Sequence, residues 1–408
     1  MIFREFQGLF RDERSRRGRE AILSVGYVFL FTLFAATGHA LGNSAPTRRR
    51  MRVALLASLL ACSHAQAAEI PKSKWNVMKN PATHGWSQEK LKAALDFATA
   101  SGSSALMVVE DGVIVGQTGD TAQKISSYSV RKSLISALYG IYSSEGVIDI
   151  NQTLEQVGID DNPPSLTKQE KQARIVDLLR ARSGVYHPVD FETQYMINIR
   201  PERGSQPPGT FWYYNNWDFN VLGTIMEQKT GLSIGEAFYR RIAKPIGMQD
   251  FRPEDVYYMD GPISKHRAYH FEITARDMAR FGLLYLRKGK WGNKQIIPSA
   301  WVEKNTEADE MIRWHDLDAG GYENLWWLEY KGAHLFGKGL PSGTYAASGA
   351  GVHVVMVIPS RRLVIVNRVS NDPPQKDPKT VIATAEHTIV STAAMGEIVN
   401  RILAAQSR

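Results

Sequence analysis

The sequence predicts an α+β fold in which one antiparallel sheet is built from the two ends of the folded region. Two alternating apolar runs, 105–109 and 113–116, flank an Asp-Gly pair, which is typical of a β-hairpin turn. Near the C-terminus the runs 351–358 and 363–369 flank a Pro-Ser-Arg-Arg turn in the same way. Helical periodicity dominates from about 151 to 328, which predicts a mainly helical region inserted into the sheet.

Helices are predicted both inside this insertion and on either side of it, where they would flank the sheet. Ser87 and Thr274 are residue types that cap helix N-termini, and Gly184 and Gly231 are placed to end helices. The expected helices start at Ser87, run from Ser129 to about Gly146, and then cover 173–182, 219–231, 233–242, 274–287 and about 381–403.

The first 67 residues have the pattern of a targeting region. Residues 21–38 are apolar and uncharged, long enough to be considered as a membrane span. Residues 51–67 begin with Met-Arg, continue with a short apolar run and end in Ala-Gln-Ala, which describes a secretory signal peptide cleaved after Ala67. We therefore interpret residues 1–50 as a mis-assigned upstream extension, with a genuine anchor at 21–38 as the alternative, and residues 68–408 as the folded domain.

Cys62 is the single cysteine of the 408 residues and lies within the signal segment. The run Leu-Leu-Ala-Cys resembles a bacterial lipoprotein box, so lipid attachment at Cys62 is an alternative to cleavage. Either route predicts a periplasmic or secreted protein that touches the membrane only through its N-terminal signal, anchor or lipid. The exported body would form no disulfide, and a chain that is 43% hydrophobic can build a large core without one.

The net charge of +8 is weak support for a nucleic-acid partner, because much of the excess precedes the folded region. Without that basic segment the body is close to balanced, so no nucleic-acid binding is expected. The arginines concerned are Arg11, Arg14, Arg16, Arg17, Arg19, Arg48, Arg49, Arg50 and Arg52.

The pattern Ser-x-x-Lys occurs three times, and only the copy at Ser129 opens a helix apolar enough to be buried. At Ser87 the serine is expected to cap a helix with its lysine in solvent, and the copy at Ser165 lies in a polar segment. On a helix, Ser129 and Lys132 share one face, so the amine can reach the hydroxyl. Burial would lower the pKa of Lys132 enough for it to act as a base toward a serine nucleophile.

A third site residue cannot be chosen from spacing alone. Tyrosine and asparagine two positions apart occur three times, as Tyr213/Asn215, Tyr214/Asn216 and Tyr322/Asn324. The first two pairs follow a Pro-Pro-Gly turn in an aromatic-rich loop. The alternative to a catalytic role is that these aromatic residues pack beneath the helical region.

Taken together, ordered motifs over roughly residues 85–405 resemble the serine β-lactamase-related family, which includes class C β-lactamases, DD-peptidases, family VIII carboxylesterases and 6-aminohexanoate-dimer hydrolases. The matching stretches are Ser129-Val130-Arg131-Lys132, Val176-Asp177-Leu178-Leu179 with Ser183-Gly184, Pro208-Gly209-Thr210 with Tyr214-Asn215-Asn216 and Leu222-Gly223, Lys244-Pro245-Ile246-Gly247-Met248, and 274–282. The resemblance implies a β-lactamase/penicillin-binding-protein-like fold with Ser129 as nucleophile.

The resemblance also implies roles for the remaining site residues. In the family, a Leu-Gly pair follows the asparagine at a fixed distance, and this spacing selects Tyr214 and Asn216. Tyr214 would shuttle the proton, with its pKa lowered by a cationic Lys132. Asn216 would orient Lys132 or the substrate. The third family motif falls at Ala347-Ser348-Gly349, so Gly349 would allow close approach and the N–H of Ala350 would complete an oxyanion hole with that of Ser129.

At the first position of that motif the family carries lysine or histidine, which helps to bind a substrate carboxylate, and this chain has alanine. The departure argues against efficient β-lactam hydrolysis and favours small esters, amides or short peptides as substrates.

Other catalytic classes lack their motifs. The chain has no His-Glu-x-x-His and no phosphate-binding glycine loop, so no metal or other cofactor is expected. His187, His266, His270 and His334 are interpreted as loop or packing residues. Tyr186, Trp326 and Trp327 are candidates either for the cleft lining or for packing between helices.

Two hypotheses of function remain. The first is an exported serine hydrolase that works through an acyl-Ser129 intermediate. The second is a penicillin-binding or β-lactamase-like protein that is acylated by cell-wall peptides or β-lactams and turns over poorly.

Overall fold

The computed structural model describes residues 70–304, 307–370 and 390–407, all of which belong to one compact unit, residues 68–408. The predicted membrane span at 21–38, the signal peptide at 51–67 and Cys62 therefore lie outside the described residues. Within the described ranges, no helix is long and apolar enough to cross a membrane.

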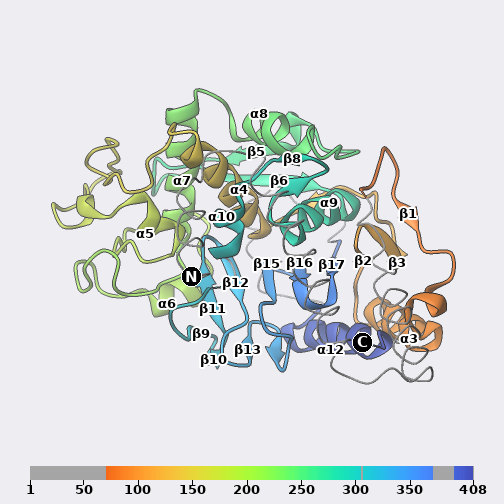
Figure 1. Ribbon diagram of the computed structural model, residues 1–408. Coiled ribbons are helices and arrows are strands. Elements are labelled where there is room, and N and C mark those ends of the chain that lie inside the picture. The colour runs from red at the N-terminus through yellow and green to blue at the C-terminus, as the bar shows by residue number, and fades with distance from the viewer. Residues whose placement is uncertain (1–69, 305–306, 371–389, 408) are drawn as a thin grey trace, which may run out of the picture. The chain divides into compact units, whose positions relative to one another are not determined.

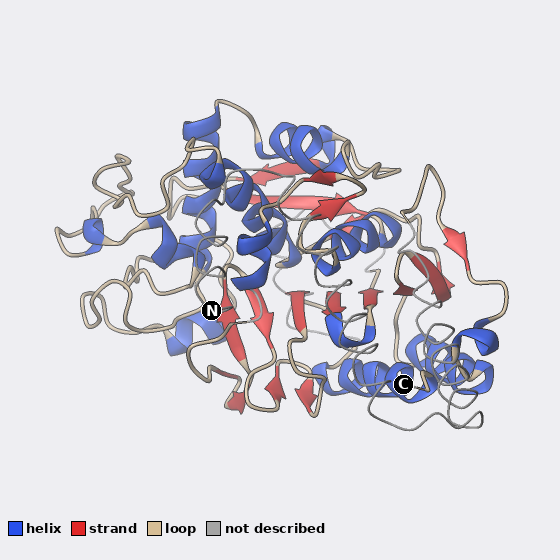
Figure 2. Ribbon diagram, viewed as in Figure 1, coloured by secondary structure: helices blue, strands red, loops and turns tan. Residues whose placement is uncertain are grey.

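The described residues form an eight-stranded sheet that joins both ends of the folded region (Figures 1 and 2). Neighbouring strands pair antiparallel, except that β1 is parallel to β3. The spatial order is β1 (Asn76–Val77), β3 (Val113–Gly119), β2 (Ala105–Glu110), β17 (Leu363–Arg368), β16 (His353–Ile358), β15 (Tyr345–Gly349), β12 (Trp326–Leu328) and β11 (Gly321–Glu323).

The predicted topology is confirmed at the centre of this sheet, where the N-terminal and C-terminal hairpins pair through β2 and β17. Strands β11 and β12 correct the predicted insertion, which was placed at about 151–328: residues 321–328 already belong to the sheet. Each strand has only three residues and every side chain in it is buried, so the sequence shows no alternation of apolar and polar residues there.

The described helices mostly agree with the predicted positions. They are α3 (Gln88–Ala100), α4 (Val130–Ser144), α5 (Ile175–Leu179), α6 (Gln194–Ile199), α7 (Asn216–Thr230), α8 (Ile234–Phe238) with its π-helical continuation η4 (Tyr239–Ala243), α9 (Ala275–Leu286), α10 (Ser299–Glu303) and α12 (Thr392–Ala405). Single 3₁₀ turns are η2 (Pro81–His84), η3 (Glu170–Gln172), η5 (Pro253–Asp255) and η7 (Pro359–Arg361).

Two predicted helices differ from the structure in length. Helix α5 ends at Leu179, because Ala181 adopts a positive φ of 56° that stops the helix before the expected Gly184. The C-terminal helix begins at Thr392 rather than near 381, because the Ser391 side chain accepts from the Ala394 N–H and caps it there. Part of the predicted start, 381–389, lies outside the described residues.

Small strand pairs complete the fold. A three-stranded sheet consists of β4 (Ile125–Ser126), which precedes α4, and of β6 (Ala268–Ile273) and β5 (Val256–Met259) from the otherwise helical region. Two-residue hairpins are β7 (Lys290–Trp291) with β8 (Lys294–Gln295), β9 (Arg313–Trp314) with β10 (Leu317–Asp318), and β13 (Ala333–His334) with β14 (Gly337–Lys338).

Helices cover both faces of the main sheet, so its central strands are buried on both sides. Figure 1 shows α3 and α12 along one face and α9 with α4 on the other. The strand side chains alternate accordingly: Val355 and Val364 belong to the core beneath α4 and α9, while Met356 and Ile365 belong to the core beneath α3 and α12.

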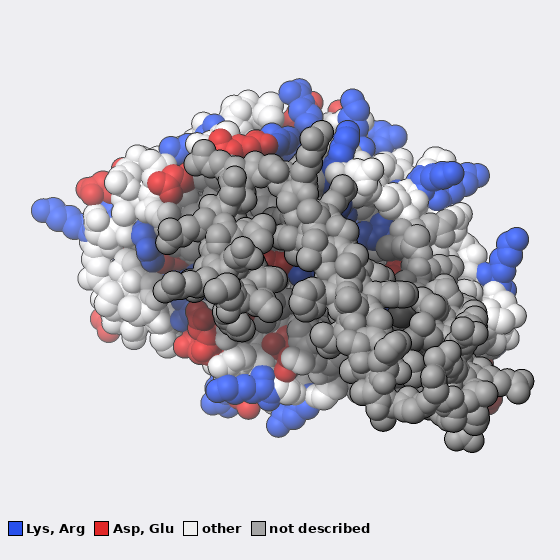
Figure 3. All heavy atoms as spheres, in the orientation of Figure 1, with Lys and Arg blue, Asp and Glu red and all other residues white. Residues whose placement is uncertain are grey.

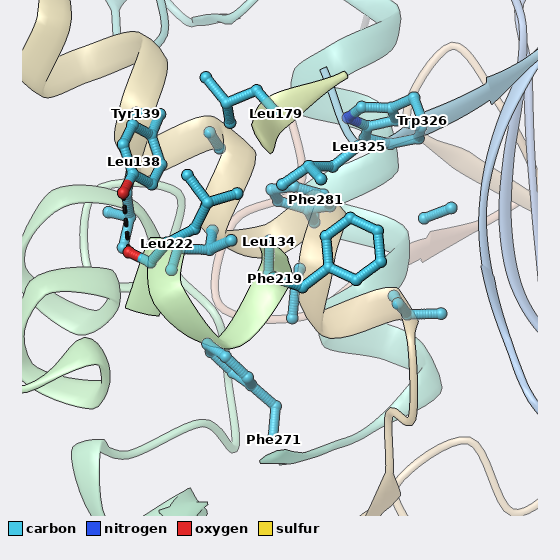
Figure 4. Packing of buried hydrophobic residues seen from close by; sticks show 14 of the residues in the cluster. Leu134, Leu138, Tyr139, Leu179, Phe219, Leu222, Phe271, Phe281, Leu325 and Trp326 are labelled. Carbon is cyan, nitrogen blue, oxygen red and sulfur yellow. Dashed lines mark hydrogen bonds between the residues drawn. The ribbon is translucent and has the colours of Figure 1, made fainter. Parts of the chain in front are cut away.

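The core around α4 fixes the helix that carries the Ser129 motif. Leu134 and Leu138 are fully buried against Phe219, Leu222 and Phe281 (Figure 4), and the Tyr139 hydroxyl donates to the Leu222 carbonyl over 2.7 Å. This packing locks α4 against α7, so residues at the N-terminal ends of these two helices hold a fixed relation.

Candidate active site

Ser129 is the residue that immediately precedes helix α4, and its side chain is free of any capping hydrogen bond. It is half-buried and lines a cavity of about 790 Å³. Tyr128 before it holds a φ of 47°, an uncommon conformation for a residue with a side chain. The hydroxyl of Ser129 is therefore held at a sharp turn between a short strand and a helix, with access to the cavity.

Lys132 lies one turn along α4, and its amine meets three oxygen atoms. Its Nζ is 3.0 Å from Ser129 Oγ, 2.6 Å from the Tyr214 hydroxyl and 3.1 Å from Asn216 Oδ1. The side chain is almost wholly buried, and this burial lowers the pKa of Lys132 well below its ordinary value, with a smaller contribution from the charge of Arg131. The amine is thus poised to be neutral while in contact with a hydroxyl.

Tyr214 and Asn216 reach the amine from the start of α7. Asn215 caps this helix by accepting from the Asp218 N–H over 2.9 Å, so the residues on either side of the cap project toward Lys132. Asn216 Nδ2 also donates to the Phe191 carbonyl, which fixes the orientation of its amide. The structure brings together the Tyr214/Asn216 pair that the family register selected.

The tyrosines of the other two Tyr-x-Asn pairs make different contacts. The Tyr213 hydroxyl donates to the Met196 carbonyl over 2.9 Å, and Tyr322 packs edge-on against the Tyr214 ring. The other Ser-x-x-Lys copies are also as expected: Ser87 caps α3 by accepting from Lys90 N–H, and Ser165 is exposed.

One electrostatic expectation is wrong. The pKa of Tyr214 was expected to fall beside a cationic Lys132, but burial raises the pKa of Tyr214 to about 12, against smaller lowering effects of its hydrogen bond with Ser129 and of the Arg131 charge. The same burial lowers the pKa of Lys132, which weakens any ammonium that could stabilise a phenolate. The phenol of Tyr214 is therefore neutral at ordinary pH.

Strand β15 places the third family motif, Ala347-Ser348-Gly349, beside Ser129. A Cβ added to Gly349 would lie 2.6 Å from the Ser127 carbonyl oxygen and 3.1 Å from the Ser129 nitrogen, so only glycine fits without displacing the backbone there. Ala350 follows at the end of the strand and lines the same cavity. Gly349 and Ala350 therefore lie beside the turn that holds Ser129.

The family model described as Beta-lactamase matches residues 91–388. The chain belongs to the beta-lactamase family. No curated protein matches.

Solved structures share the fold of this family member at low sequence identity. A putative 6-aminohexanoate-dimer hydrolase from Bacillus anthracis is 21% identical, with a TM-score of 0.55 over 83% of this chain and 89% of that one. A putative beta-lactamase from Bacteroides dorei is 16% identical, with a TM-score of 0.55 over 78% and 99%. A family VIII carboxylesterase is 15% identical, with a TM-score of 0.50 over 73% and 96%.

Aromatic side chains form one wall of the cavity in this beta-lactamase-family chain. The rings of Trp314 and Trp327 lie 5.1 and 5.5 Å from the Tyr214 ring, centroid to centroid, and all three line the cavity. Trp327 was one of the candidate lining residues. Tyr186 and Trp326, the other two, are buried and do not line it.

Sequence reasoning missed at least four cavity residues. Arg131 and Trp314 were not singled out, and His270, interpreted as packing, is buried but also lines the cavity, as does His334. The signal for Arg131 was present: a second cation beside Lys132 in the first turn of an otherwise apolar helix is hard to explain as packing. Trp314 lies on a two-residue strand, too short to produce a pattern.

The described residues include no cluster of three or more His, Cys, Asp or Glu side chains that could hold a metal ion. Lysines, arginines and acidic side chains are interspersed on the described part of the face in Figure 3.

Proposed function

We propose that this protein is a serine hydrolase that cleaves small esters or amides through a covalent acyl-Ser129 intermediate. The observation that carries the proposal is the 3.0 Å contact between a cavity-lining hydroxyl and the buried amine of Lys132, whose pKa is depressed. A weak nucleophile with an adjacent neutral base is the arrangement that covalent catalysis requires.

In the first step the Ser129 oxygen attacks the substrate carbonyl carbon, and its proton passes to Lys132 Nζ. The carbonyl oxygen then carries the negative charge. The backbone N–H groups of Ser129 and Ala350 are proposed to receive it, supported by the close approach of Gly349 to the Ser129 nitrogen. The start of α4 adds the favourable field of a helix N-terminus.

In the second step the tetrahedral intermediate expels its leaving group, which needs a proton. Tyr214 is suited to donate it, because its phenol is neutral and hydrogen-bonded to Lys132 at 2.6 Å. The ammonium of Lys132 returns a proton to Tyr214 as it leaves. Water then attacks the acyl group, its proton follows the same route, and Ser129 leaves as the hydroxyl with the acid released.

The substrate class is inferred from the cavity. Its aromatic wall favours apolar acyl or leaving groups, and Ala347, buried in the sheet, supplies no cation at the position of the family lysine or histidine. Two fold neighbours, a putative 6-aminohexanoate-dimer hydrolase and a family VIII carboxylesterase, agree with amide or ester cleavage. We propose that the enzyme acts in the periplasm or outside the cell, on the basis of the signal-like segment 51–67.

The test is hydrolysis of p-nitrophenyl esters by the purified 68–408 fragment, whose residues form one compact unit. Activity should vanish in Ser129→Ala and persist in Ser165→Ala, a matched control at an exposed Ser-x-x-Lys copy. Unchanged activity in Ser129→Ala would contradict the proposal. Stoichiometric acylation by a labelled penicillin without turnover would favour the alternative, a penicillin-binding protein that turns over poorly.

A further inference from the structure

Arg131 is a buried cation that the proposed reaction does not use. It lies in the first turn of α4 between Ser129 and Lys132, is 4% exposed and lines the same cavity. Its Nη2 donates to Asn220 Oδ1 over 3.2 Å, and its guanidinium lies 4.4 Å from the centroid of the Tyr269 ring. Its Nη1 is buried and has no hydrogen-bond partner.

No carboxylate in the described part of the chain forms an ion pair with this guanidinium, which contacts an amide oxygen and an aromatic ring. Among the acids of the cavity, Asp190 accepts from the backbone N–H groups of Ile263 and Ser264, and Asp316 and Asp318 are exposed on the β9–β10 hairpin. A buried charge without a partner is costly, and folded proteins normally pair it.

A second polar atom without a partner belongs to a residue that lines the same cavity. His270, on β6, is buried, lines the cavity and stacks on Tyr257, while its Nδ1 has no hydrogen-bond partner. Burial and the charges of Arg131 and Lys132 lower the pKa of His270 to about 3, so the imidazole is neutral. A neutral imidazole still carries one N–H group that can donate.

We propose that Arg131, with Asn220 and His270 beside it, is the subsite for a carboxylate carried by the substrate. This inference rests on the proposed function and narrows its substrate class to esters or amides with an anionic group a few carbons from the scissile carbonyl. The free guanidinium N–H can bind one carboxylate oxygen in a charge-assisted hydrogen bond. Arg131 thus supplies the positive charge that Ala347 does not.

The test compares two esters of equal chain length, mono-p-nitrophenyl glutarate and p-nitrophenyl pentanoate. The unsubstituted enzyme should prefer the glutarate ester in kcat/KM. Arg131→Gln should lose about tenfold or more on the glutarate ester and less than about threefold on the pentanoate, and Arg131→Lys should recover part of the loss. Lys338→Gln, which removes an exposed cation from the same cavity, should leave the preference unchanged.

Equal losses on both esters in Arg131→Gln, or no preference in the unsubstituted enzyme, would overturn the subsite. If Lys338→Gln also loses the preference for the glutarate ester, the preference comes from the overall positive potential of the cavity. That result would also overturn the Arg131 subsite.

Binding to Ser129→Ala, measured by calorimetry, separates the subsite from the chemistry. Glutarate should bind, glutaramide should not, and the further change Arg131→Gln should abolish glutarate binding. If Ser129→Ala still hydrolyses esters while glutarate binds, the proposed function fails and the subsite stands. If glutarate does not bind, the subsite fails. Should Arg131→Gln not fold, the difference between glutarate and glutaramide on the Ser129→Ala protein decides.

Discussion

Lys132 sets the pH range in which the site can act, because only its neutral form can accept the proton of Ser129. Burial lowers the pKa of Lys132 well below its ordinary value, so the amine is neutral above that folded pKa and protonated below it. We expect kcat/KM for a neutral ester to fall as the pH is lowered through this pKa. Lys132→Arg should lose about 10³-fold or more, because arginine stays protonated.

The measurement is the pH dependence of kcat/KM with p-nitrophenyl pentanoate between acid and alkaline pH. An activity that is independent of pH, or that Lys132→Arg retains, would exclude Lys132 as the base.

Tyr214 is expected to act on the leaving group and not as the first base. Since the pKa of Tyr214 is raised to about 12, its phenol remains a donor across the neutral range. Tyr214→Phe should lower kcat by about 10²–10⁴-fold, with a larger effect on alkyl esters, whose alkoxides need a proton, than on p-nitrophenyl esters. Equal loss on both ester types would argue that Tyr214 only positions Lys132.

At this scale the sequence predicted the residues of the site better than their charges. The three-residue spacing and the apolar helix after it were enough for Ser129 and Lys132, and the family register was needed to choose Tyr214. The direction of the Tyr214 pKa shift was wrong, because it depends on how deeply the amine and the phenol are buried together. The depth of burial depends on how α4, α7 and the aromatic wall pack together, and a local sequence pattern carries no information about that packing.

Among the elements, the N-terminal end of α7 positions two residues that contact Lys132. Asn215 Oδ1 accepts from the Asp218 N–H over 2.9 Å, and the residues on either side of this cap contact Lys132. Asn215→Ala should lower the free energy of unfolding by about 1 kcal/mol, because the cap is lost. Asn215→Ser, which can still cap, should lose less.

Urea unfolding of the two variants checks this prediction. Equal destabilisation by alanine and serine would mean that Asn215 acts through its buried amide packing and not through the cap.

Longer elements could be predicted from the sequence, and the shortest could not. Helices α3, α7 and α9 have side-chain caps, α4 has a long apolar run, and both sheet hairpins have turn residues between alternating runs. The two-residue strands β9, β10, β13 and β14 have too few residues for any period. They help to form one side of the cavity, so the substrate-facing surface was the least predictable part of the chain.

On the scale of the whole molecule, burial of histidines makes the fold sensitive to acid. His334 is fully buried and its Nδ1 accepts from the Phe336 N–H; burial lowers its pKa from 6.5 to about 4. The unfolded chain takes up this proton below about pH 6.5, while the folded chain resists it until about pH 4. Stability linked to His334 is therefore present above pH 6.5 and is lost as the pH falls through this window.

We expect His334→Gln to reduce the loss of unfolding free energy between pH 7 and pH 5 by about 1–2 kcal/mol. Denaturant titrations at the two pH values measure this, with His84→Gln, an exposed histidine, as the matched control. A pH dependence in His334→Gln equal to that of the unsubstituted protein would contradict the assignment.

The central claim is that Ser129 becomes covalently acylated. The direct measurement is the mass of the 68–408 fragment after mixing with p-nitrophenyl pentanoate and quenching in acid, followed by peptide mapping. The account predicts one pentanoyl group on the peptide that contains Ser129, released on further incubation before quenching, and none in Ser129→Ala. Hydrolysis without a mass increase in the unsubstituted protein, or an acyl group mapped to another residue, would contradict it.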